Sequence, residues 1–259
     1  MTSTEPQRIS SAANAVLRDL RRLAQGNTAY RKQGQVWLEG DHLCRAAVAR
    51  NVTPVIAVFS ESCWPQARVE WGNAGGRTVI VADPLFESIS GLESPARMGF
   101  VIALSPQAPL DPHAPSVVLD RIQDAGNVGA ILRSASAFGF RQVIALKGTA
   151  ALWSPKVLRA GMGAHFALNL IDAAEDALLD ALAVPLITTS SHQGEYLHRQ
   201  KLPWPCAWAL GHEGQGVSEA VASRAGLAVR IAQPGGEESL NVASAAAICL
   251  HACAIAHAG

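Results

Sequence analysis

Three segments in the C-terminal half of this 259-residue chain combine glycines with isolated polar side chains. The side chains in them that could do chemistry are two amides, a guanidinium, a carboxylate and a hydroxyl: Asn127, Arg133, Glu213, Ser239 and Asn241. Because glycine has no Cβ, a glycine loop lets a ligand approach the main chain closely. The segments therefore predict a binding site made of main-chain groups and a few polar side chains.

Arg133 is the charged residue of a predicted helix over 128–138, which otherwise consists of small and apolar residues. A charge in such a helix is expected to need an anionic partner, because a buried unpaired charge is costly. RNA phosphate is one candidate partner, and a nearby carboxylate, Asp120 or Asp124, is the other. The pattern of residues does not choose between them.

The second segment, residues 208–218, contains Gly211, Gly214 and Gly216 and ends at Ser218, a good N-cap for the following helix. Its carboxylate, Glu213, either anchors the turn or faces a substrate. In the third segment, a strand ending at Ile231 leads through a glycine turn to Asn241, which is placed to cap the last helix.

The order and spacing of the segments resemble the signature motifs of the SpoU-type (TrmH-like) RNA 2′-O-methyltransferases of the SPOUT superfamily. Motif one, N-x-G-x-x-x-R, is matched by Asn127, Gly129 and Arg133. Motif two, L-G-x-E-x-x-G-[LV]-S, is matched over 210–218, with His212 where the family often has Asn or Ser.

Motif three of the family, I-P-M-x-G-x-x-[ED]-S-L-N-V-[SA]-x-A, is matched from Ile231 through Gly235 and Glu238 to Asn241. Ala232 and Gln233 replace its Pro and Met. The resemblance implies S-adenosylmethionine (AdoMet) as cofactor and no metal. It also implies that Ser239 and Asn241 shape the catalytic pocket.

By the same resemblance, main-chain groups around Leu210, Gly211, Ile231 and Leu240 bind the adenine and ribose of AdoMet. Thr188, with Thr189 and Ser190, is a weaker candidate for this pocket. The resemblance makes Arg133 the residue that activates the ribose 2′-hydroxyl. A guanidinium is always protonated in proteins, so a role as electrostatic clamp is as coherent as a role as base.

The alternation of strands and helices predicts an α/β fold with two domains. We expect a small α/β domain over 1–104 that binds the RNA substrate, a proline-rich linker over 105–115 and a methyltransferase domain over 116–259. The resemblance further implies a parallel sheet, a C-terminal trefoil knot and a homodimer.

Segment boundaries follow from hydrophobic periodicity and from turn residues. Strands are expected at 36–38, 55–59, 78–81, 100–104, 117–119, 143–146, 166–170, 185–189, 207–210 and 227–231. Helices are expected at 11–25, 41–50, 84–90, 128–138, 173–181, 218–225 and 241–257. Gly139 stands where a glycine ends a helix.

Net charge is zero, which argues against an indiscriminate nucleic-acid binder, but residues 1–50 hold eight Arg or Lys against four acids. We expect this segment to bind RNA through five basic residues, Arg18, Arg21, Arg22, Arg31 and Lys32. A solvated helix face is the alternative interpretation. Ribosomal RNA is favoured as the substrate, with transfer RNA second.

Five cysteines without a C-x-x-C pair suit a reducing cytoplasm. Cys249, Cys253 and His257 recur every fourth residue, but in an alanine-rich helix they are more typical of buried apolar positions than of metal ligands. Polar residues interrupt the apolar stretch 242–258, and it is too short to span a membrane.

Two other functions are compatible with parts of this pattern. A dinucleotide-dependent oxidoreductase would use glycine loops after strands, but the chain has no G-x-G-x-x-G. A non-catalytic RNA-binding protein could have kept the fold, although Asn127, Arg133, Glu213, Ser239 and Asn241 are all present.

Overall fold

The computed structural model describes residues 5–90, 94–190, 194–235 and 239–257. Contacts divide the chain into two compact units, of which unit 1 comprises Met1–Pro106 and Trp153–Phe166 and unit 2 comprises Gln107–Leu152 and Ala167–Gly259. Residues 153–166 thus group with unit 1, although they lie within the stretch expected to form the second domain.

Unit 1 is built on a mixed sheet of strands in the order β1-β4-β3-β5-β2. The strands are β1 (Gln7–Ile9), β2 (Gln35–Glu39), β3 (Ile56–Ser60), β4 (Arg77–Val81) and β5 (Met98–Ala103). β1, β4 and β3 run parallel, whereas β5 is antiparallel to both β3 and β2. β1 is a strand that hydrophobic periodicity did not predict, because it is short and half polar.

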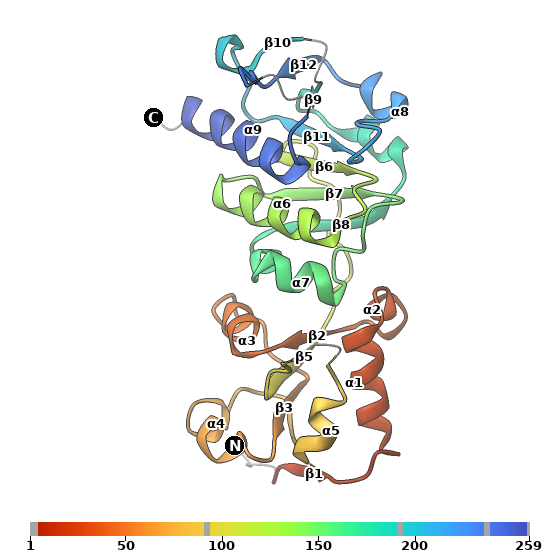
Figure 1. The fold of residues 1–259 in the computed structure, drawn as a ribbon, viewed down its shortest axis with the longest axis vertical. Helices are drawn as coiled ribbons and strands as arrows, with labels where there is room; N and C mark the ends of the chain where they lie inside the picture. The colour runs from red at the N-terminus through yellow and green to blue at the C-terminus, as the bar shows by residue number, and fades with distance from the viewer. Residues whose placement is uncertain (1–4, 91–93, 191–193, 236–238, 258–259) are drawn as a thin grey trace. The chain divides into compact units, whose positions relative to one another are not determined.

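Helices cover both faces of this sheet (Figure 1). They are α1 (Ala15–Gln25), α2 (Ala29–Gln33), α3 (Asp41–Val48), α4 (Trp64–Trp71) and α5 (Asp83–Glu87), and α7 (Pro155–Gly161) groups with the same unit. On one face, Leu17 and Leu20 of α1 and Phe86 of α5 pack with Val58 and Val79 of the sheet. On the other, α4 contributes aromatic contacts, such as Trp71 against Phe100 with ring centroids 5.2 Å apart.

Unit 2 contains an all-parallel sheet in the order β10-β12-β9-β11-β6-β7-β8. The strands are β6 (Ser116–Asp120), β7 (Gln142–Leu146), β8 (Asn169–Ala174), β9 (Leu186–Thr189), β10 (Glu195–Tyr196), β11 (Ala207–Gly211) and β12 (Leu227–Arg230). The central strands β6, β7 and β11 are buried along their whole length. The prediction of a mostly parallel, buried sheet is therefore confirmed.

Helical segments pack on the faces of this second sheet. They are α6 (Ala125–Ala137), η2 (Asp176–Ala181), η3 (Leu197–Arg199), α8 (Glu219–Ala222) and α9 (Val242–Ala256). The 3₁₀ segment η1 (Ala164–Ala167) contains the point in the sequence at which unit 1 ends and unit 2 resumes. Helices α6 and α9 lie side by side, as Figure 1 shows. Val118 of β6 packs with Leu179 of η2 and Val221 of α8 in a separate cluster.

Strand register brings the segments singled out by sequence to one edge of the sheet. Gly211 at the end of β11 pairs with Asp120 at the end of β6, and Thr188 of β9 pairs with Ala209 of β11. In a parallel sheet the carboxyl ends of all strands lie at the same edge, where α/β proteins commonly bind ligands. The loops after β6, β9, β11 and β12 therefore meet there.

Most predicted elements appear within a few residues of their expected ends. α6 begins at Ala125 rather than Val128, because Asp124 caps it by accepting a hydrogen bond from the Asn127 N–H. The predicted helix 173–181 is instead the end of β8 followed by the 3₁₀ segment η2. The bounds of α2, α4, α7 and β10 were not predicted. Among the described residues, no helix is long and apolar enough to cross a membrane.

The glycine that follows α6 offers a test of how local backbone strain sets stability. Gly139 has φ +82°, whereas Gly226, which precedes β12, does not have a positive φ. At both positions an added Cβ would meet no atom within 4 Å. Gly139→Ala should lower the free energy of unfolding by about 1 kcal/mol through left-handed strain. Gly226→Ala should raise it by about 0.5 kcal/mol.

Urea unfolding of both variants and the wild type measures this difference. Equal unfolding free energies for Gly139→Ala and Gly226→Ala would show that the conformation of Gly139 imposes no strain on a side chain.

Candidate active site

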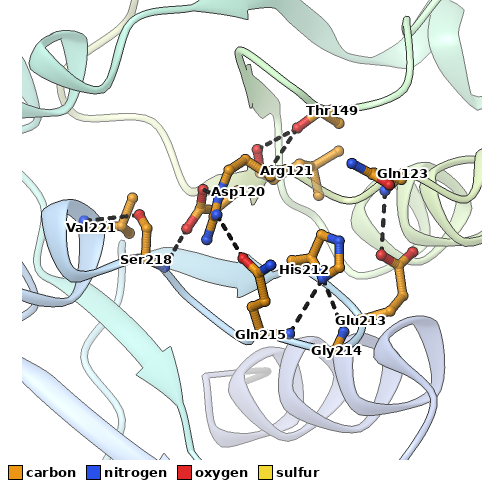
Figure 2. A network of polar contacts seen from close by, with 11 residues as sticks. Asp120, Arg121, Gln123, Thr149, His212, Glu213, Gly214, Gln215, Ser218 and Val221 are labelled. Atoms are coloured by element: carbon orange, nitrogen blue, oxygen red, sulfur yellow. Dashed lines mark hydrogen bonds and ion pairs between the residues drawn. The ribbon is translucent and has the colours of Figure 1, made fainter.

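A buried carboxylate stands at the carboxyl end of β6. Asp120 is 2% exposed, and its Oδ2 accepts a hydrogen bond from the Ser218 N–H at 2.6 Å. Its Oδ1 accepts from Nε of Arg121 at 3.0 Å. Both carboxylate oxygens are thus used inside the fold, and the first of these bonds fastens the end of the motif-two loop to β6 (Figure 2).

Arg121 adopts a conformation that residues with a Cβ seldom adopt, with φ +60°. Its N–H donates to Thr149 Oγ1 at 3.1 Å, and its Nη1 donates to Gln215 Oε1 at 3.0 Å. These contacts, drawn in Figure 2, hold the residue in that conformation. Sequence reasoning missed Arg121 and Thr149. The sequence feature that could have indicated Arg121 is the Asp-Arg pair that directly follows the predicted strand 117–119.

The motif-two loop is closed by its own main chain and by His212. The Gly216 N–H donates to the His212 carbonyl at 2.8 Å. Nδ1 of His212 accepts from the N–H groups of Gly214 and Gln215 at 3.0 and 3.3 Å. A Cβ on Gly211 would lie 2.1 Å from main-chain atoms of Gly216 and Val217, so this turn requires glycine. His212 therefore acts as a turn acceptor.

Glu213 joins motif two to motif one. Its carboxylate accepts hydrogen bonds from the N–H groups of Gln123 at 3.3 Å and Asp124 at 3.2 Å, and from Nδ2 of Asn127 at 3.0 Å. Burial raises the pKa of Glu213, but these hydrogen bonds outweigh it and leave the pKa below its usual value. In this structure Glu213 anchors a loop, one of the two roles expected for it.

Asn127 joins motif one to motif three. Its Oδ1 accepts a hydrogen bond from Nδ2 of Asn241 at 2.9 Å. Oδ1 of Asn241 in turn accepts from the N–H groups of Ala243 and Ser244 at 2.9 and 3.2 Å, which confirms that Asn241 caps α9. The three motifs therefore converge through one hydrogen-bonded series, Glu213–Asn127–Asn241.

Arg133 differs from the expectation. It lies on α6 but is exposed, and within the described part of the chain its guanidinium forms neither an ion pair nor a side-chain hydrogen bond. Asp120 and Asp124, the carboxylates considered as partners, are occupied by Ser218 and Arg121 and by the α6 cap. The premise of a buried charge was therefore wrong, and the structure leaves Arg133 free to meet an anion.

A cavity of about 140 Å³ lies at the carboxyl ends of β9 and β12 and the start of α9. The residues that line it are Thr189, Ser190, Ile231, Gln233, Ser239, Leu240 and Ala245. Among the described residues, Gln233 Oε1 is a buried acceptor without a hydrogen-bond partner. The site thus combines apolar side chains, hydroxyl groups and an unused acceptor.

Other predicted ligand-binding residues are absent from the lining of the cavity. Thr188 and Leu210 are buried within β9 and β11, and Gly211 closes the motif-two turn. Glu238 of motif three and Gly236 of the glycine turn fall outside the described residues.

The basic residues expected to bind RNA lie on α1 and α2 of unit 1. Arg18, Arg22 and Lys32 are exposed. Arg21 donates to Ser88 Oγ through Nε at 3.2 Å and Nη2 at 2.6 Å, so it also fastens α1 to the segment after α5. Arg31 lies over the Tyr30 ring, with its Cζ 5.5 Å from the ring centroid.

The cysteines of α9 behave as apolar residues. Cys249 and Cys253 are buried, and Cys253 Sγ lies 3.6 Å from Cys206 Sγ. Burial raises the pKa of Cys249 to about 12, which keeps it a neutral thiol. His257 contacts the Leu202 carbonyl. Within the described ranges, no group of three or more His, Cys, Asp or Glu residues could hold a metal ion.

Comparison with known proteins identifies the family. The SpoU rRNA methylase family matches residues 114–251, more than half of the chain. The chain is 28% identical over 251 residues to the 23S rRNA guanosine 2′-O-methyltransferase RlmP of Bacillus subtilis, covering 95% of this chain and 98% of that protein.

Two solved structures show the same fold. An RNA 2′-O ribose methyltransferase is 26% identical, with a TM-score of 0.76 over 95% of this chain and 98% of that one. The AdoMet-bound rRNA methyltransferase of Sinorhizobium meliloti is 24% identical, with a TM-score of 0.84 over 99% of this chain and 100% of that one. This chain belongs to the SpoU rRNA methylase family.

Proposed function

We propose that this protein transfers a methyl group from AdoMet to a ribose 2′-hydroxyl of ribosomal RNA. The observation that carries the proposal is the convergence of the three motifs through Glu213, Asn127 and Asn241. The cavity lies directly beside them, because Ser239 and Leu240 precede Asn241 in the chain and line that cavity. The family to which the chain belongs is a methylase family.

The cavity residues fit AdoMet. The cofactor has an apolar adenine face, for which Ile231 and Leu240 supply apolar contacts. It also carries amino groups that donate hydrogen bonds, and Gln233 Oε1 is a buried acceptor without a partner among the described residues. A buried polar group without a hydrogen bond is destabilising, so a ligand that donates one is favoured there.

AdoMet supplies an electrophilic methyl group on a sulfonium, so the transfer itself needs no metal. The protein must orient the acceptor hydroxyl and stabilise the negative charge that develops on its oxygen. Arg133 is exposed and free of an ion pair within the described residues, and we assign it to the phosphate and to that oxygen. Glu213, Asn127 and Asn241 hold the loops in position.

Ribosomal RNA is preferred over transfer RNA because RlmP, a relative that this chain matches along nearly its whole length, acts by its name on 23S rRNA. We assign RNA binding in unit 1 to Arg18, Arg22, Arg31 and Lys32. Arg21 also belongs to this basic segment, and its guanidinium donates a hydrogen bond to Ser88.

We also propose a homodimer and a trefoil knot in unit 2, both on the family resemblance. Support for the dimer comes from α9, where the apolar side chains of Ile248 and Ile255 are 41% and 59% exposed. Such side chains are normally buried, and a second copy would cover them. The free state of all five cysteines supports a cytoplasmic location.

The decisive experiment adds the purified protein and methyl-labelled AdoMet to unmodified 23S ribosomal RNA transcribed in vitro. A 2′-O-methyl group blocks alkaline cleavage at its own position, so one protected nucleotide is expected. RNA that stays unlabelled, in this assay and in cells that contain the protein, would instead favour a non-catalytic RNA-binding protein.

Replacing Arg133 should separate catalysis from stability. Arg133→Ala is expected to lower kcat at least about 100-fold, because it removes an electrostatic contact made in the transition state. Unfolding free energy should change by less than about 0.5 kcal/mol, because the side chain is exposed. Arg141→Ala, at another exposed arginine of unit 2, serves as the control. Wild-type methylation by Arg133→Ala would overturn the assignment.

Replacing Gln233 by Met tests the cavity. The change removes the buried acceptor while keeping the length of the side chain, so the free energy of unfolding without cofactor should rise. AdoMet binding, measured by titration calorimetry, should weaken about fivefold because a hydrogen bond is lost. Gln66→Met, at an exposed position of α4, is the control. Unchanged AdoMet affinity in Gln233→Met would exclude a contact between Gln233 and the cofactor.

The depressed pKa of Glu213 predicts a pH-dependent contribution to stability. Because the folded-state pKa lies below the unfolded value of about 4.3, the ionised carboxylate stabilises the fold fully above that value. The contribution is lost as pH falls through the folded-state pKa.

Urea unfolding of the wild type and Glu213→Gln at several pH values tests this. The wild type should be more stable by a constant margin near neutral pH, and the margin should shrink as the pH falls below about 4.3. A margin that is independent of pH in the acid range would show that ionisation of Glu213 does not hold the loop.

A further inference from the structure

Unit 2 carries a cluster of basic and aromatic side chains that the motifs do not include. We call Tyr196, His198, Arg199 and Arg230 the Tyr196 cluster. The Cζ atom of Arg230 lies 4.5 Å from the centre of the Tyr196 ring, and that of Arg199 lies 5.7 Å from it. The His198 ring stacks on Tyr196 with centroids 5.7 Å apart.

The positive charge of this cluster is not neutralised by the fold. Within the described residues, Arg199 and Arg230 form no ion pair, whereas Arg121, Lys147 and Arg224 of the same unit each pair with a carboxylate. The neighbouring acid, Glu195, accepts a hydrogen bond from the Tyr196 N–H. Two guanidinium groups that lie against one aromatic ring without anionic partners form a site for a polyanion.

Strand register places the cluster at the same edge of the sheet as the cavity. Tyr196 of β10 pairs with Arg230 of β12, and Arg230 directly precedes Ile231, which lines the cavity. The Ser190 N–H, from another residue of the cavity lining, donates to the carbonyl of Val229. A strand of RNA whose ribose reached the cavity would therefore pass close to Arg230.

Arg230 is held in place before any ligand arrives. Its Nε donates to the Gly194 carbonyl at 2.9 Å, and its guanidinium lies over the Tyr196 ring. Among the described residues its terminal nitrogens have no hydrogen-bond partner. A planar guanidinium held in this way binds a phosphate with two hydrogen bonds and loses little side-chain entropy on binding.

We propose that the Tyr196 cluster binds the phosphates of the RNA strand next to the nucleotide that is methylated. The proposal rests on the proposed function, because it takes RNA as the substrate. It adds a contact surface on unit 2 to the basic residues of unit 1. Arg230 and Arg199 contact phosphate, and Tyr196 holds their guanidinium groups in position.

Salt dependence of binding tests the proposal with the full chain and unmodified 23S ribosomal RNA transcribed in vitro. Each phosphate contact contributes about 0.7 to 0.9 to the slope of log K against log salt concentration. The double variant Arg199→Ala/Arg230→Ala should therefore lower the slope by about 1.4 to 1.8 and weaken RNA binding at least about tenfold. AdoMet affinity should not change.

Arg141→Ala is the matched control, because Arg141 is exposed and lies before β7, at the opposite edge of the parallel sheet. It should keep the wild-type slope. Arg230→Lys keeps the charge, so it should keep the slope while weakening binding through loss of the bidentate contact. A wild-type slope and affinity in the double variant would overturn the proposal.

Two further measurements separate a loss of RNA binding from misfolding and from failure of the proposed function. Arg199→Glu changes only an exposed side chain, so a loss of RNA affinity there does not arise from misfolding, and wild-type affinity in this variant would also count against the proposal. Methyl incorporation by the wild type is measured in parallel. A wild type that binds RNA with the expected slope but never methylates it would refute the proposed function and leave the RNA surface intact.

Discussion

The hydrogen-bonded amide of Asn127 is the interaction on which the rest of the site depends. Its Nδ2 donates to Glu213, which is 86 residues away in the sequence, and its Oδ1 accepts from Asn241, which is 114 residues away. Each partner also controls local structure, because Glu213 accepts from two N–H groups before α6 and Asn241 caps α9. A single amide thereby fixes the starts of two helices relative to the motif-two loop.

The buried Asp120 provides a second attachment for the same loop. Its bond to the Ser218 N–H holds the far end of the loop, while Arg121 reaches the middle through Gln215. This arrangement explains why His212 is tolerated where the family often has Asn or Ser. The position needs an acceptor for two N–H groups, and a neutral imidazole nitrogen supplies one.

Charge is distributed so that structural and functional roles are separated. Arg121 and Arg224 are engaged with carboxylates and stabilise loops, whereas Arg133 and Arg230 have no ion pair among the described residues. Neither of these two arginines gains stability from an ion pair with a described residue, so the identity of each is free to be set by a ligand. In unit 2 these arginines lie on α6 and at the carboxyl end of β12, and the cavity lies beyond that same strand end.

The sequence by itself determined the features that depend on neighbouring residues. Periodicity located most strands of the parallel sheet, and the caps at Ser218 and Asn241 and the glycine after α6 follow from residues within four positions of each other. Only the tertiary structure decided which carboxylate Ser218 meets, that Arg133 is exposed, that Gln233 has a buried acceptor without a partner, and that Arg230 lies over Tyr196. These relations join residues from different strands, and strand order and register are set by packing of the whole sheet rather than by local propensity.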